Sequence, residues 1–145
     1  MASGDVPTLR SALGNQGTRV GADLAGDPVA DAVLDPKLLR LQRLGADLAS
    51  FGIDPSTASP LPAVARYVAA IESTRTDPAR YVAHHYTRYL GDLSGGQVVA
   101  HRMREHYGVD DAALSFYSFD EIDKLKRYKD AYRARLDALP LDAAG

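Results

Sequence analysis

Three glycines within six residues, Gly91, Gly95 and Gly96, constrain this chain more than any other feature, because they fall inside a stretch that is otherwise typical of a helix. Asp77 precedes Pro78 where the stretch begins, a pairing favoured at helix starts, and apolar residues then recur at helical spacing. Each glycine in a helix interior costs about 1 kcal/mol relative to alanine, so the three together cost about 3 kcal/mol. This part of the chain therefore needs a backbone without side chains.

Gly91 and Gly95 lie one helical turn apart, and Asp92 and Gly96 form the neighbouring row. The spacing predicts a bare strip of helix with one carboxylate at its edge, where the glycines also allow the helix to bend. A second helix or a flat ligand would fit such a strip, and the spacing leaves both open. Ser94 does not lie in the G-x-S-x-G pattern of hydrolases, and no dinucleotide or P-loop motif occurs.

The composition excludes several classes of protein. A chain of 145 residues, 46% hydrophobic and 25% charged, is long enough to bury one core. A net charge of -2 without a basic block gives no reason to expect nucleic acid, and no apolar run reaches the roughly 18 residues of a membrane span. The N-terminus lacks the pattern of a secretory signal. Without cysteine, disulfides and thiolate ligands are excluded, and we expect a cytoplasmic protein.

Helical periodicity dominates the chain and strand-like alternation is not visible, so we predict an all-α fold. Residues 1–26 are expected to form a partly flexible lead-in, with a weak helix through Leu13 and glycines that interrupt any longer one. Asp-Pro pairs mark several helix starts, and glycine or proline marks helix ends. The expected helices cover residues 28–34, 36–51, 63–74, 78–107 and 120–139, with a loop at 53–62.

Two long segments carry a resemblance to a known family. The run "AHHYTRYLGDLSGGQV" resembles the distal heme helix of the heme oxygenases, and "FYSFDEIDKLKRYKDAYRARLD" resembles the helix that follows it and the turn before that helix. Bacterial members of the actinobacterial type look most similar. The resemblance implies a partial heme oxygenase-like helical domain at residues 27–145, with a kinked, glycine-rich distal helix, preceded by a lead-in at 1–26 that lacks family resemblance.

The resemblance assigns a role to a basic row on the last expected helix, formed by Lys126, Lys129 and Arg133. Such rows are usually solvated surface. In the heme oxygenases, the positions that match Lys129 and Arg133 contact the heme propionates, and Tyr86 matches a tyrosine that also contacts a propionate. Basic side chains suit this role because propionates are carboxylates, to which arginine offers a fork of donors.

The resemblance also implies a reaction, the oxidative opening of heme to biliverdin, iron and carbon monoxide. Gly91, Gly95 and Gly96 would let the helix backbone approach the heme, and Asp92 would order the water that delivers protons. Arg88 lies one turn before Asp92 and is placed to hold it. The reaction needs dioxygen and electrons, and the sequence shows no flavin or nicotinamide motif. A separate reductase is therefore expected as partner.

One element of the family pattern is missing, the axial histidine of an early helix. No histidine precedes His84, and the others are His85, His101 and His106. We expect none of them to bind the iron, although His101 and Glu105 have the spacing of a metal-ligand pair.

The resemblance therefore predicts a domain truncated at both ends, with weak heme binding and little turnover. The alternative to an active heme oxygenase is a non-catalytic helical domain of the same descent that binds heme or another protein.

Overall fold

A computed structural model of the protein describes residues 17–57 and 59–141, and within these residues the secondary structure is helical throughout, as predicted. Residues 17–24 form the first described helix. The later α-helices are α2 (Pro28–Asp31), α3 (Leu41–Ser50), α4 (Pro62–Glu72), α5 (Pro78–Tyr107) and α6 (Leu125–Asp137). Short 3-10 helices connect them: η1 (Pro36–Leu38), η2 (Pro55–Thr57), η3 (Ser73–Thr76), η4 (Asp111–Ala113) and η5 (Ser115–Tyr117).

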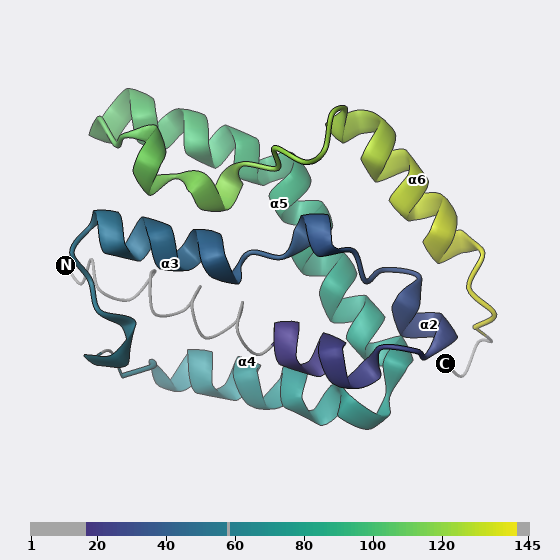
Figure 1. The fold of residues 1–145 in the computed structure, drawn as a ribbon. Coiled ribbons are helices and arrows are strands. Elements are labelled where there is room, and N and C mark those ends of the chain that lie inside the picture. The colour runs from purple at the N-terminus through teal and green to yellow at the C-terminus, as the bar shows by residue number, and fades with distance from the viewer. Residues whose placement is uncertain (1–16, 58, 142–145) are drawn as a thin grey trace.

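The 30-residue helix α5 is the centre of the fold and crosses the whole molecule (Figure 1). It begins where the sequence predicts, because the Asp77 carboxylate accepts a hydrogen bond from the Arg80 amide at 3.1 Å. It ends at Gly108, whose φ of 60° is the left-handed conformation that glycine adopts most easily. The helical backbone continues through all three glycines, and the expected kink stays a prediction.

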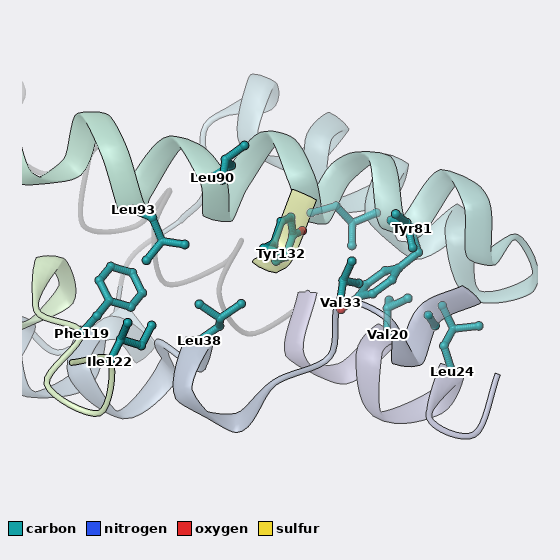
Figure 2. Packing of buried hydrophobic residues seen from close by; sticks show 13 residues of the cluster. Val20, Leu24, Val33, Leu38, Tyr81, Leu90, Leu93, Phe119, Ile122 and Tyr132 are labelled. Carbon is teal, nitrogen blue, oxygen red and sulfur yellow. The ribbon is translucent and has the colours of Figure 1, made fainter. Parts of the chain in front are cut away.

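Two hydrophobic clusters pack against α5, one toward each of its ends. The first combines its N-terminal half, including Tyr81 and Leu93, with α2 and α6, and Tyr132 of α6 lies beneath α5 in this cluster (Figure 2). The second combines Ala100, on the C-terminal half of α5, with α3 and η5. Gly91 and Gly95, in the middle of α5, belong to neither cluster and are exposed.

The helix expected over residues 36–51 is interrupted by Arg40, which separates η1 from α3. Its guanidinium donates to the carbonyl oxygens of Leu38 and Phe116, each at 3.2 Å, and also to that of Ser118. The side chain is only 4% exposed. A buried guanidinium needs such acceptors, and two of them lie far away in the chain, so the local pattern could not show this interruption.

The last helix also begins later than predicted, at Leu125 rather than near residue 120. Phe119 and Ile122 are 6% and 8% exposed and belong to the first hydrophobic cluster. A turn, in which the Ile122 amide donates to the Phe119 carbonyl at 2.9 Å, turns both side chains into the core. The burial of Phe119 and Ile122 therefore stabilises the turn more than an extension of the helix through these residues would.

The predicted lead-in overlaps with a helix. Residues 17–24 are helical, and Val20 and Leu24 are buried in the first cluster, so the expectation that glycines break any helix there is wrong at Gly21. That glycine permits close packing, since a Cβ atom on it would lie 2.5 Å from Tyr81 Oη. The weak helix expected through Leu13 lies outside the described residues, and a domain boundary at residue 27 stays a prediction.

In the described part of the chain, no helix combines the length and the hydropathy that crossing a bilayer requires.

Candidate functional site

Gly91 and Gly95, called the glycine strip below, lie on the side of α5 that faces away from both clusters. Both are exposed, and a Cβ atom built on either would meet no described atom within 4 Å. The alternative of a tight helix–helix contact through these two glycines is therefore not observed in the described residues. Gly96 differs, because it is buried and a Cβ on it would lie 3.2 Å from Tyr117 Cδ1.

At the edge of the glycine strip, Asp92 forms the expected ion pair with Arg88. Arg88 Nε and Asp92 Oδ2 lie 3.1 Å apart, and the side chains are only 29% and 18% exposed. The Arg88 guanidinium also lies 5.3 Å from the centre of the Phe116 ring. Partial burial makes this pair stronger than a typical surface pair, so the carboxylate has a fixed position beside the strip.

The basic row of α6 lies next to the same side of α5. Lys129 Nζ is 3.2 Å from the hydroxyl of Ser94, which lies between the two strip glycines in the sequence. Arg133 forms a 3.4 Å contact with Asp130, as does Lys126 at 2.9 Å. Hydrogen bonding by Lys126 lowers the pKa of the Asp130 carboxyl. Lys129 is thus the member of the row that extends toward the strip, because it contacts Ser94 beside Gly95.

Tyr86, the remaining predicted contact, projects from α5 with 44% of its surface exposed. The structure therefore brings three kinds of group together at the exposed side of the α5–α6 pair: bare backbone, a paired carboxylate and the basic side chain of Lys129. Tyr86 lies five residues before Gly91, which places it on another side of α5.

A small cavity lies beside Arg88, between the N-terminal half of α5 and the helices that precede it. It has a volume of about 40 Å³, which is enough to hold water. It is lined by Gly17, Arg40, Tyr67, Ile71, Tyr81, His84, His85, Arg88 and Tyr89.

None of the four histidines belongs to a group of three or more potential metal ligands in the described residues. His84 Nδ1 lies 3.4 Å from Tyr67 Oη at the cavity. His101 is near Glu105, at 3.7 Å, as the spacing predicts, but Arg102 occupies the same carboxylate at 3.1 Å. A cation already bound there disfavours a metal ion at this position.

Sequence reasoning missed the groups that complete this region. Tyr67 of α4 and Arg40, which precedes α3, line the cavity, and Gln97 Nε2 donates to the Tyr117 carbonyl at 2.7 Å beside Gly96. These pairs are distant in sequence, and no periodic pattern links them. The one local signal is the spacing of Arg88 and Asp92, which predicts their ion pair.

Comparison with known proteins gives one consistent result. The family model described as "Heme oxygenase" matches residues 21–145. The chain is 36% identical over 121 residues to heme oxygenase 1 of the cyanobacterium Synechocystis, and 41% identical over 86 residues to human heme oxygenase 1. These alignments cover 81% and 57% of this chain, but 50% and 30% of those proteins. The chain thus spans half the length of the cyanobacterial relative and less than a third of the length of the human one.

Solved structures agree with this result. The crystal structure of the Synechocystis heme oxygenase-1 in complex with heme superposes with a TM-score of 0.89 at 30% identity, covering 99% of this chain and 68% of that one. The heme oxygenase of Leptospira interrogans gives a TM-score of 0.84 at 28% identity, covering 99% and 74%. The fold and the family model therefore point in the same direction.

Proposed function

Because the chain belongs to the heme oxygenase family, we propose that it binds heme against the glycine strip and acts in the oxidative cleavage of heme to biliverdin, iron and carbon monoxide. The observation that carries this proposal is the open glycine strip, where no described atom lies within 4 Å of a Cβ built on Gly91 or Gly95. A flat macrocycle needs such a surface, and both the carboxylate and the basic row border it.

The residues present fit a heme with its propionates toward α6. Lys129 and Arg133 would bind the propionates through charge-assisted hydrogen bonds, and Tyr86 would contact one of them from α5. Gly91 and Gly95 would lie against the porphyrin plane, whereas Gly96 supports the site from behind through its packing on Tyr117. When bound, heme supplies the iron that activates dioxygen and the ring that is oxidised.

Asp92 is the residue that would control protons. Because Arg88 holds the Asp92 carboxylate in place, the carboxylate can accept a hydrogen bond from water at a fixed position. The neighbouring cavity, which Arg88 lines and which is large enough to hold water, would keep water next to this ion pair. We infer that Asp92 orders a water at the edge of the strip, which acts as the proton donor, and that Arg88 is its positioning residue.

Two further parts of the proposal concern the surroundings of the protein. Electrons would come from a separate reductase, since the reaction consumes reducing equivalents and the sequence contains no motif for a flavin or nicotinamide. We propose a cytoplasmic setting, with which the absence of cysteine is compatible.

The test combines a hemin titration with a turnover assay. Hemin is added to the purified protein and its absorption recorded, and then dioxygen and a reductant are supplied and biliverdin is measured. If the unmodified protein forms biliverdin, Asp92→Ala is expected to bind hemin as that protein does, but to form biliverdin about 10²- to 10⁴-fold more slowly. Asp110→Ala, which removes an exposed carboxylate elsewhere, is the matched control and should leave both unchanged.

Equal turnover in Asp92→Ala and Asp110→Ala would remove Asp92 from the reaction. Hemin binding by the unmodified protein without any biliverdin would favour the alternative function, a non-catalytic heme-binding domain.

A further inference from the structure

A buried hydrogen bond joins α5 to α6 and has no part in the proposed chemistry. His85 Nδ1 and Tyr132 Oη lie 2.7 Å apart, and the two residues are 7% and 0% exposed. Their rings stack at 14° with centres 5.9 Å apart, and the Tyr89 ring lies 4.3 Å from that of His85. Figure 2 shows Tyr132 of α6 beneath α5, among the first hydrophobic cluster.

Both partners are neutral at ordinary pH. Burial lowers the pKa of His85 to about 3 and raises that of Tyr132 above its usual value. In the neutral state, one of the two groups, His85 Nδ1 or the Tyr132 hydroxyl, can donate the proton of this hydrogen bond and the other can accept it. A buried polar atom that loses its partner costs more than the bond itself contributes, so this contact strongly favours one placement of α6 on α5.

That placement determines where the basic row lies. Lys129 is one helical turn before Tyr132, and Arg133 directly follows it. The second polar contact between the two helices, from Lys129 to Ser94, is exposed and is weaker because water competes for both groups. On its other side, α6 is held by a 2.5 Å hydrogen bond from Tyr128 to the carboxylate of Asp35, which precedes η1, and by a 2.9 Å hydrogen bond from Arg135 to the Ala32 carbonyl. Neither of these bonds reaches α5.

We propose that His85 is a positioning residue for the propionate-binding cations: by holding Tyr132, it fixes Lys129 and Arg133 at the correct distance from the glycine strip. This inference rests on the proposed function. It assigns His85 a role in heme affinity that is exerted through α6, without contact between His85 and heme. A role of this kind concerns the charged propionates alone, and this sets it apart from a general contribution to stability.

The test uses two probes, hemin and hemin dimethyl ester, whose propionates are esterified and uncharged. Tyr132→Phe removes only the hydroxyl of the buried pair. It is expected to weaken hemin binding about tenfold, since the loss of one charge-assisted hydrogen bond is of that order, and to leave binding of the ester unchanged. His85→Asn keeps a hydrogen-bonding atom near the position of Nδ1 and should therefore retain part of the hemin affinity that Tyr132→Phe loses. Tyr107→Phe, at a tyrosine that is 76% exposed, is the matched control.

A double variant tests the route through the cations. When Lys129 and Arg133 are both alanine, Tyr132→Phe is expected to have no further effect on hemin binding, because the groups that it displaces are gone. Thermal melts without hemin establish that each variant is folded. If Tyr132→Phe does not melt cooperatively, the same two titrations are made with His85→Gln, whose longer side chain cannot place its amide at the Nδ1 position.

The outcomes separate the two proposals. If Tyr132→Phe weakens hemin and its ester equally, the residue supports the fold only, and the inference is wrong. Unchanged hemin affinity in Tyr132→Phe also overturns the inference but leaves the proposed function intact. Failure of the unmodified protein to bind hemin at all would overturn the proposed function, and the inference with it.

Discussion

Replacing the strip glycines by alanine should stabilise the protein and weaken heme binding at the same time. In a helix interior, alanine is favoured over glycine by about 0.8–1.0 kcal/mol. The full gain is expected at Gly91 and Gly95, since a Cβ there meets no described atom within 4 Å. Unfolding entropy of about 2.1 cal/mol/K per residue corresponds to roughly 0.3 kcal/mol/K for a chain of this length. Each substitution should therefore raise the melting temperature by about 3 °C.

The same methyl group would stand between the helix and a porphyrin. We expect Gly91→Ala and Gly95→Ala each to weaken hemin binding by about tenfold or more, because the added methyl groups would overlap with the bound ring and force it away from its other contacts. The assays are a thermal melt of the protein without hemin, followed by circular dichroism, and a hemin titration followed by absorption.

Two other glycines provide matched controls. Gly45 of α3 is exposed, with no described atom within 4 Å of a built Cβ, so Gly45→Ala should stabilise the protein equally and leave hemin affinity unchanged. Gly96→Ala should stabilise the protein less than Gly45→Ala does, because its Cβ would lie 3.2 Å from the Tyr117 ring and the crowding offsets the helix-propensity gain. The reasoning is refuted if Gly91→Ala lowers the melting temperature, or if it raises it while hemin binds as tightly as to Gly45→Ala.

Three further predictions address the other groups. Changing Lys129 and Arg133 together to alanine should weaken hemin binding, by up to about 1.5–3 kcal/mol for each charge-assisted bond, with helix content unchanged by circular dichroism; equal affinity would mean that the row is solvated surface. The depressed pKa of His85, about 3 against 6.5 in the unfolded chain, means that stability is complete above pH 6.5 and falls by about 1.4 kcal/mol per pH unit as the pH drops toward 3; urea denaturation of His85→Phe should lack this component. Asp47 accepts hydrogen bonds from the Ser115 amide and hydroxyl and from the Phe116 amide, so Asp47→Ala should cost about 3 kcal/mol or more in urea denaturation, whereas a loss below 1 kcal/mol would contradict this account.

The features that the sequence predicted correctly depend on neighbouring residues. The Asp77 cap, the Gly108 end and the Arg88–Asp92 pair each involve residues within four positions of one another. Local rules of helix chemistry are sufficient for these, which is why the all-α fold and the long glycine-containing helix could be predicted.

The features that it missed depend on distant contacts. Arg40 interrupts a helical pattern because its acceptors include the Phe116 carbonyl, 76 residues later. His85 pairs with Tyr132 across 47 residues, and periodicity alone only places the two on separate helices. The glycine strip lies between these cases: spacing showed that side chains were absent, but only the three-dimensional structure showed that Gly91 and Gly95 face open space while Gly96 faces Tyr117.

The division of the core into two clusters along α5 has a consequence for backbone motion. Leu93 belongs to the first cluster and Ala100 to the second, and Gly95 and Gly96 lie in the segment of α5 between them. Amide hydrogen exchange measures the free energy of local opening, and separately packed regions often open as separate units. We expect the amides on the two halves of α5 to exchange with two different opening free energies. The segment of α5 that would lie against heme then also joins two halves of the helix that open independently of each other.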